Sequence, residues 1–447
     1  MNTRARPLAA LGAGLTAALL LAACGQSEDA ATPAASTTPE PTATAAESAS
    51  LKPRLVLTYD GGIQVLDATT LEPVADLELD GFNRVNPAGD GRHVMVSTAG
   101  GFQVLDAGTW EQAHGDHSHY FVAEPRLTDL VYDAETPGHV VVHEGRTALF
   151  DDGTGQVTVV DSADIAHPDA ARREFTTPQA HHGVAVELSD GSVVVSEGDE
   201  DARTGIRLLA ADGSQTAAND QCPGVHGEAV AAGETVVIGC EDGALVVAGG
   251  QITKVTSPDA YGRIGNQAGS EDSPIVLGDY KSDPDADLER PTRVSLIDTR
   301  TAELTLVDLP SSYTFRSLAR GDDGEALVLG TDGNLHVIDP ETGTLVRSMP
   351  VLDAWEEPED WQQPRPAIQV HEGTAYITDP ANDRLLAVDV LTGEVWNTAD
   401  LTVTPNELTV ATGEAASHEA HDDHADEHEH ADEHDDHDHD HDEHEDH

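Results

Sequence analysis

Basic residues are scarce in this 447-residue chain, which has 23 Lys and Arg against 83 Asp and Glu and a formal net charge of −60. Nucleic-acid phosphates require basic patches, so nucleic acid is excluded as a partner. Beyond the first two dozen residues no run is apolar enough to cross a membrane, and no helical periodicity is sustained. The sequence also lacks a Gly-x-Ser-x-Gly elbow, a phosphate loop and a His-Glu-x-x-His motif, so no catalytic motif stands out.

The first residues have the features of a signal sequence. Arg4 and Arg6 precede an apolar run over 8–23, which is shorter than the roughly 20 apolar residues that span a bilayer. The run ends in Leu-Ala-Ala-Cys, which resembles a bacterial lipobox with Cys24 as the lipidated residue. An ordinary cleaved signal peptide or a short uncleaved anchor is the alternative. We therefore predict a lipoprotein signal peptide over 1–23 and an extracytoplasmic protein, lipid-anchored to the bacterial cell membrane.

Two further segments contain almost no large apolar side chains. Residues 24–50 are mostly Ala, Thr, Ser, Pro and Glu, and we expect a lipid anchor followed by a flexible linker. Residues 413–447 form an acidic tail, which from His418 onward consists of eleven His, sixteen Asp or Glu and three Ala. No core can form from that composition, so the tail is predicted to be disordered.

The imidazoles of the tail indicate metal binding. A tail that only improves solubility, which is the alternative, needs no imidazole, whereas imidazole and carboxylate at close spacing offer many ligand sets for zinc and similar ions. The predicted metal-binding residues of the tail are His418, His421, His424, His428, His430, His434, His437, His439, His441, His444 and His447.

The body of the chain, residues 51–412, carries short β-rich runs separated by Asp-Gly pairs such as 60–61, where Gly supplies the positive φ of tight hairpins. The runs repeat at about 36 to 55 residues, the spacing of four-stranded propeller blades. We predict an all-β fold, a β-propeller with eight blades or, alternatively, seven, in which a strand over 407–411 completes the first blade. The first strands of the other blades are predicted near Phe82, Pro125, His182, His226, Arg263, Phe315 and Ala367.

Two cysteines remain after Cys24. Cys222 precedes one predicted first strand, and Cys240 ends the next strand of the same blade. In an exported protein this pair favours a disulfide, with a thiolate metal pair as the alternative. Without the sixteen carboxylates of the tail the chain keeps a formal charge of −44, and such a field attracts cations.

Histidines also cluster within the body. His114, His117 and His119 lie within six residues, and the last two project from one face of an extended chain. His182 and His226 each open a predicted first strand in consecutive repeats. We predict that these three stretches converge at one end of a central channel, where four imidazoles would suffice for a tetrahedral Zn²⁺ site. They are His117, His119, His182 and His226.

Other residues beside these imidazoles are predicted as substitute ligands or as partners that orient the imidazoles. They are Asp116, Glu228, His114 and His181. The histidines that lack such company are predicted not to be ligands, and turn chemistry alone is the alternative for every His-Gly pair. The predicted non-ligands are His93, His139, His143, His167, His336 and His371.

The segment His-Gly-Asp-His-Ser-His-Tyr at 114–120, the segment Cys-Pro-Gly-Val-His-Gly-Glu-Ala at 222–229 and the repeats together resemble the AztD-type zinc metallochaperones. Those proteins are extracytoplasmic propellers that hand zinc to the solute-binding protein of an ABC importer. The resemblance covers about residues 51–411 and implies that four of the histidines lie at or near the high-affinity site. These are His117, His119, His182 and His226. The lipobox and the C-terminal tail depart from a simple periplasmic chaperone.

The sequence therefore predicts a zinc metallochaperone. Its tail captures Zn²⁺ loosely, its channel site holds the ion tightly, and a docked solute-binding protein removes it by ligand exchange. One alternative is a propeller hydrolase or quinone-type dehydrogenase with a channel metal, and another is a surface scaffold whose tail buffers metal. A catalytic metal keeps a position open to water and substrate, whereas a carrier site can be fully ligated.

Overall fold

The computed structural model describes residues 45–115 and 117–415. They form thirty-six β-strands and one short 3-10 helix, η1 (Ser162–Asp164), so the predicted all-β class is confirmed. Within these ranges no helix is long and apolar enough to cross a membrane. Cys24, Asp116 and the eleven predicted tail ligands lie outside the described residues.

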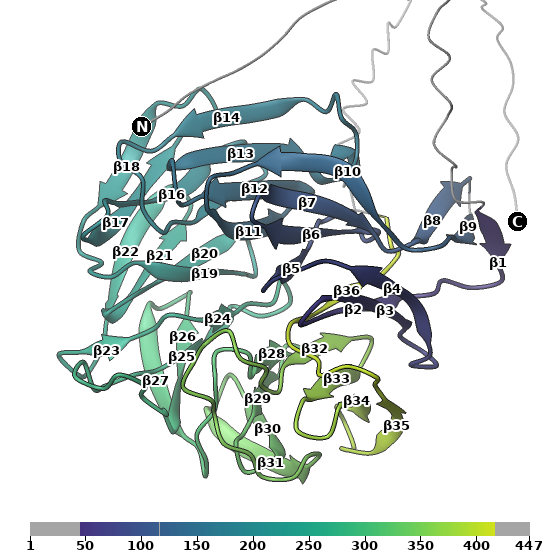
Figure 1. Cartoon of the computed structure of the whole chain (residues 1–447). Helices are drawn as coiled ribbons and strands as arrows, with labels where there is room; N and C mark the ends of the chain where they lie inside the picture. The colour runs from purple at the N-terminus through teal and green to yellow at the C-terminus, as the bar shows by residue number, and fades with distance from the viewer. Residues whose placement is uncertain (1–44, 116, 416–447) are drawn as a thin grey trace, which may run out of the picture. The chain divides into compact units, whose positions relative to one another are not determined.

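Seven antiparallel sheets of four strands, and one sheet whose four antiparallel strands are joined by a short parallel fifth, make up most of the fold (Figure 1). The first sheet joins segments far apart in the chain, β36 (Leu408–Ala411), β2 (Arg54–Tyr59), β3 (Gly62–Asp67) and β4 (Pro73–Glu78). The second contains β5 (Arg84–Pro87), β6 (His93–Thr98), β7 (Gly101–Asp106) and β10 (Arg126–Asp133).

The remaining six sheets follow in chain order. The third and fourth contain β11 (Pro137–His143), β12 (Arg146–Asp151), β13 (Gln156–Asp161) and β14 (Arg172–Thr176), then β15 (Ala185–Glu187), β16 (Val193–Gly198), β17 (Arg203–Leu209) and β18 (Gln215–Asn219). The fifth contains β19 (His226–Ala231), β20 (Thr235–Cys240), β21 (Asp242–Ala248) and β22 (Gln251–Thr256), with β23 (Gly262–Arg263) paired to β21.

In the last three of these sheets the four strands again lie side by side in the order of the sequence. They contain β24 (Gln267–Ala268), β25 (Ile275–Asp279), β26 (Arg293–Asp298) and β27 (Glu303–Asp308); β28 (Leu318–Arg320), β29 (Ala326–Leu329), β30 (Asn334–Asp339) and β31 (Thr344–Pro350); and β32 (Ile368–His371), β33 (Thr374–Asp379), β34 (Arg384–Asp389) and β35 (Val395–Asp400). A ninth sheet has three strands, β1 (Ala46–Ser48), β9 (His117–Val122) and β8 (Thr109–His114).

The core lies between neighbouring sheets. One cluster packs Val184 and Val186, at the start of the fourth sheet, against Val236 and Ile238 of the fifth. Strands covered on both faces, such as β2 and β3, are buried over five consecutive residues, whereas the outer strand β4 consists of exposed and half-buried residues. Gly61 adopts a φ of 111° in the turn between β2 and β3, as expected for an Asp-Gly hairpin.

The first strands of neighbouring sheets contact one another, and this brings the site residues together. β11 contacts β5 and β15, and β19 contacts β24. The same holds along β24, β28, β32 and β36, and β36 contacts β5. The strand predicted over 407–411 exists as β36 and pairs with β2, with Leu57 opposite Leu408.

One predicted first strand is wrong. Residues after Pro125 form β10, which pairs with β7 as the fourth strand of the second sheet, and the first strand of the third sheet is β11. The reason is an insertion, because the hairpin of β8 and β9 interrupts the chain between β7 and β10. In addition, β1 lies inside the segment predicted to be a flexible linker, and its Ala46 pairs with Val122 of β9.

A disulfide joins Cys222 to Cys240 and fixes the end of β20 to the segment before β19. Both residues are fully buried in the cluster shared by the fourth and fifth sheets. A cross-link between residues 18 apart stabilises the folded chain by about 3 kcal/mol, mainly by restricting the unfolded chain.

Reducing this disulfide is therefore expected to lower the free energy of unfolding by about 3 kcal/mol. The measurement is denaturant unfolding of the oxidised and reduced chains. The control is a chain carrying both Cys222→Ala and Cys240→Ala, whose stability should not respond to reductant. An unchanged midpoint for the native chain on reduction would contradict the prediction.

Candidate metal centre

Three histidines from consecutive sheets form a cluster. His139 lies on β11, His182 precedes β15 and His226 opens β19. The ring of His182 has its centroid 4.9 Å from that of His139 and 5.0 Å from that of His226, and the outer pair is 5.9 Å apart. The contacts between first strands thus bring together imidazoles that are up to 87 residues apart in the sequence.

Each of these imidazoles is oriented through its Nδ1 atom. His139 donates to the carbonyl of Gly183 at 2.8 Å, and His226 donates to the carbonyl of Gly265 at 2.6 Å. His182 donates to the Asp152 carboxylate at 2.5 Å. Because carbonyl and carboxylate oxygens only accept, Nδ1 carries the proton in each ring. Partners of this kind fix the tautomer of a metal-binding histidine and leave Nε2 for the metal.

The Nε2 atoms of His182 and His226 face each other at 3.2 Å. If both rings are neutral with Nδ1 protonated, their Nε2 lone pairs face one another, so the contact requires either a proton on one Nε2 atom or a metal ion between the two. Zinc bound to nitrogen at about 2.0–2.1 Å in tetrahedral geometry separates two ligand nitrogens by about 3.3 Å. The observed spacing fits a metal ion held by both rings.

The surroundings of His139 and His226 keep these two imidazoles neutral. Burial, together with the nearby Arg263 guanidinium, lowers the pKa of His226 to about 3. Burial and the neighbouring imidazoles lower the pKa of His139 well below its ordinary value. A neutral imidazole is the form that binds metal, so neither ring has to lose a proton at neutral pH.

Glu228 lies on β19 and lines the same cavity as these three rings. Burial raises its pKa to about 7. Its Oε2 atom is buried and has no hydrogen-bond partner among the described residues. A buried carboxylate that lacks a partner could serve as a metal ligand.

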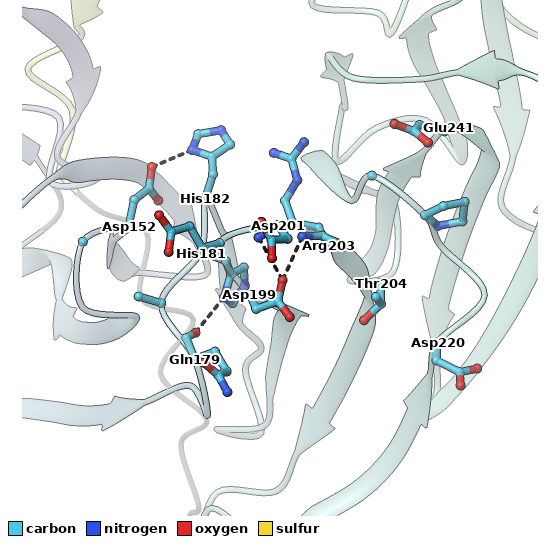
Figure 2. A pocket seen from close by; sticks show the side chains of 16 residues that line it. Asp152, Gln179, His181, His182, Asp199, Asp201, Arg203, Thr204, Asp220 and Glu241 are labelled. Carbon is cyan, nitrogen blue, oxygen red and sulfur yellow. Dashed lines mark hydrogen bonds and ion pairs between the residues drawn. The ribbon is translucent and has the colours of Figure 1, made fainter. Parts of the chain in front are cut away.

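Two cavities meet at His182, which lines both. The outer cavity, of about 940 Å³, is mainly acidic, and Figure 2 shows Asp152 directed at His182 from one side. Its acidic lining residues are Asp152, Asp199, Glu200, Asp201, Asp220 and Glu241. The inner cavity, of about 480 Å³, contains His139, His226 and Glu228.

A second group of histidines lies on the hairpin of β8 and β9. The Nε2 atoms of His117 and His119 are 3.2 Å apart, and Nδ1 of His119 contacts the Glu47 carboxylate at 2.8 Å. His114 is opposite His117 in the hairpin, and ligand atoms of all three imidazoles lie within 4.8 Å of one another. This group is largely exposed, so a metal bound here would be open to solvent.

The predicted convergence of these histidines at one channel end does not occur. His117 and His119 lie on the hairpin of the three-stranded sheet, and Figure 1 shows β8 and β9 to one side of the fold, away from β11 and β19. The four predicted ligands thus form two groups instead of one. The hairpin of β8 and β9 is inserted between β7 and β10 of the second sheet. It therefore does not connect to β11, the first strand of the third sheet.

The prediction missed His139 and misjudged His181. The supposed first strand near Pro125 displaced β11 from its true position, and Gly138-His139 on β11 would otherwise have matched the other two His-bearing first strands. Nδ1 of His181 donates to the Gln179 carbonyl at 3.0 Å, and its Nε2 is hydrogen-bonded to the Ser196 hydroxyl at 2.9 Å. Neither nitrogen of His181 is left for a metal.

A third group joins turns rather than lining either cavity. Ligand atoms of His143, Glu144 and Glu234 lie within 4.8 Å of one another. The Glu234 carboxylate contacts His143 at 3.2 Å and accepts from the backbone and hydroxyl of Ser189 at 2.7 and 2.6 Å. These bonds connect the turns after β11, β15 and β19, which accounts for the group structurally.

The sequence matches no protein-family model. It is similar to the zinc chaperone AztD of Citrobacter koseri, with 25% identity over 374 residues, or 81% of this chain and 86% of that protein. The crystal structure of Citrobacter koseri AztD has a TM-score of 0.70 at 23% identity, covering 81% of this chain and 98% of that chain.

Two further structures are similar. Apo AztD from Citrobacter koseri has a TM-score of 0.69 at 22% identity, over 80% of this chain and 98% of that one. The dihydro-heme d1 dehydrogenase NirN has a TM-score of 0.52 at 12% identity, over 80% and 75%. The predicted resemblance to AztD is confirmed, and the fold is AztD-like.

Asp152 gives a direct test of how the cluster is oriented. Asp152→Asn is expected to weaken metal affinity about 10- to 100-fold, because the partner of a ligating histidine fixes its tautomer and raises its basicity. The measurement is Zn²⁺ affinity by competition with a chromophoric chelator. Asp220→Asn removes one carboxylate from the same outer cavity without touching His182 and serves as the control. Equal affinities for the two variants would show that Asp152 contributes only charge.

Proposed function

We propose that this chain is an extracytoplasmic zinc metallochaperone that binds Zn²⁺ and transfers it to the solute-binding protein of a zinc ABC importer. The observation that carries the proposal is the His182–His226 pair, whose Nε2 atoms face each other at 3.2 Å while both Nδ1 atoms are held by acceptors. Similarity to a protein named a zinc chaperone adds the metal and the role. That name also favours a zinc carrier over the alternative of a propeller hydrolase or quinone-type dehydrogenase with a channel metal.

The tight site takes His182 and His226 as its central ligands. His139 and Glu228 line the same cavity and supply the remaining ligands. Imidazole nitrogen and carboxylate oxygen in tetrahedral geometry are the ligands that zinc prefers outside thiolate sites. The disulfide between Cys222 and Cys240 removes both cysteines as thiolate ligands.

The outer cavity attracts the ion. Six carboxylates line it, and His182 lies at its boundary with the inner cavity. Clefts lined by one sign of charge raise the local concentration of counter-ions and their rate of association. In this account Zn²⁺ enters through the acidic outer cavity and is passed to His182.

The hairpin and the tail act together in capture. Glu111 of β8 donates its backbone N–H to the Gly413 carbonyl at 2.8 Å, and its carboxylate accepts from the Ala415 backbone at 3.0 Å. The acidic His-rich sequence starts at His418, three residues further on. The tail therefore leaves the described chain beside the strand that carries His114. Weak, exposed ligands on both segments would collect Zn²⁺ for the inner site.

An eight-bladed propeller is the architecture that we propose for the AztD-like fold. Eight sheets that each contain four antiparallel strands in a row, the contacts between most of their first strands and the pairing of β36 with β2 support this count over seven. In a propeller the first strands surround a central channel. The inner cavity, which residues of several first strands line, would then be part of that channel.

We further propose that the mature chain is anchored to the cell membrane by lipid on Cys24. The Leu-Ala-Ala-Cys sequence supports the anchor, and the buried disulfide supports a compartment outside the cytoplasm, where disulfides persist. A lipidated carrier would remain close to the membrane-bound importer that its partner serves.

Loss of both central ligands tests the proposed site. The double variant His182→Gln and His226→Gln is expected to lose tight Zn²⁺ binding and to keep only the weak binding of the hairpin and tail. The measurement is competition with a chelator of nanomolar affinity, with metal content determined after separation of protein and chelator.

The matched control changes the other group, with His114→Gln, His117→Gln and His119→Gln together, and should retain one tightly bound Zn²⁺. Tight binding that survives the first set of changes would place the site elsewhere. If the unaltered chain does not bind Zn²⁺ tightly, the alternative function is favoured, in which the protein is a surface scaffold and only its tail buffers metal.

A further inference from the structure

Unpaired cations line the inner cavity. The chain has only 23 Lys and Arg against 83 Asp and Glu, and buried arginines elsewhere pair with acids, as Arg316 does with Glu407. Arg84, Arg263 and Lys281 line the inner cavity, and none of their side chains has an ion pair or hydrogen bond within the described residues. Three cations that form no direct ion pair, in so acidic a protein, indicate that the cavity binds an anion.

The charge of the cavity lining is positive overall. Glu228 is its one carboxylate, against the three cations Arg84, Arg263 and Lys281. These cations line the same cavity as the metal-binding imidazoles His139, His182 and His226. An empty cavity would therefore oppose the binding of a divalent metal ion at the same imidazoles.

Two polar side chains of the cavity lack partners. Both Oε1 and Nε2 of Gln267, and Oε2 of Glu228, are buried without a hydrogen-bond partner among the described residues. Gln267 lies on β24 and lines the inner cavity. Protein atoms cover these groups almost completely even with the cavity empty, so they do not contact a ligand in the cavity and the three cations alone carry the inference.

We propose that the inner cavity binds a small carboxylate anion, held by Arg84, Arg263 and Lys281. Arginine offers paired N–H donors that match a carboxylate. A volume of about 480 Å³ accommodates a molecule of a few carbons. The choice of a carboxylate over other anions rests on the proposed function, because a carboxylate can also ligate zinc held by His182 and His226.

The carboxylate has two possible sources. One is a free organic acid that enters with the metal, and the other is an Asp or Glu side chain of the tail, which carries sixteen of them. In either case the anion offsets the charge of the three cations. The bound anion therefore raises the affinity for Zn²⁺, and bound Zn²⁺ raises the affinity for the anion.

The test is calorimetric titration of succinate into the metal-free full-length chain. One succinate is expected per chain, with affinity at least about tenfold weaker in Arg84→Gln and in Arg263→Gln, because a hydrogen bond to a charged group contributes that much. Arg300→Gln is the matched control, since Arg300 is exposed, pairs with Asp298 and Glu341, and does not line the cavity. Thermal unfolding of each variant verifies that it folds.

A second chain, in which the His, Asp and Glu of 418–447 are replaced by Ser and Gly at equal length, separates the sources. Tighter succinate binding by that chain identifies the tail as the natural occupant, and unchanged affinity identifies a free acid. The inference is overturned if neither chain binds succinate saturably or if Arg84→Gln and Arg263→Gln bind it normally. The variant with His182→Gln and His226→Gln should still bind succinate, so failure of the metal site is a separate result.

Discussion

Two imidazole nitrogens that both carry lone pairs lie 3.2 Å apart, and the acceptors behind the rings hold them there. The Asp152 carboxylate and the Gly265 carbonyl keep the proton on each Nδ1. Either a proton on one Nε2 atom or a metal ion between the rings satisfies this arrangement, and the spacing of 3.2 Å suits two ligands of one tetrahedral zinc ion. The sheets contribute by packing third against fourth and fourth against fifth, because each histidine lies on or next to the first strand of one of them.

Charge is distributed in two layers around that pair. Carboxylates line the outer cavity and cations line the inner one, with His182 at the boundary. The outer charge favours entry of Zn²⁺, while the inner charge limits how firmly the ion is held unless an anion accompanies it. A carrier has to bind its ion and also release it to a partner. Opposite fields on the two sides of one ligand are compatible with both requirements.

Local patterns in the sequence were sufficient to predict the sheets and part of the site. Asp-Gly pairs and apolar runs predicted the hairpins, and the repeat placed His182 and His226 correctly beside first strands. The excursion of β8 and β9 was not predictable from the repeat, because its residues have the same β-rich character as a blade strand. That excursion hid His139 and suggested a single site. Asp152 was missed because its contact with His182 spans 30 residues and depends on how two sheets pack.

The most direct test of the account is the position of zinc in a crystal of the full-length chain containing one equivalent of Zn²⁺. An anomalous difference map at the zinc edge should show its strongest peak in the inner cavity, about 2.0–2.1 Å from Nε2 of both His182 and His226. A strongest peak at the hairpin of His114, His117 and His119, with none between His182 and His226, would contradict the central claim.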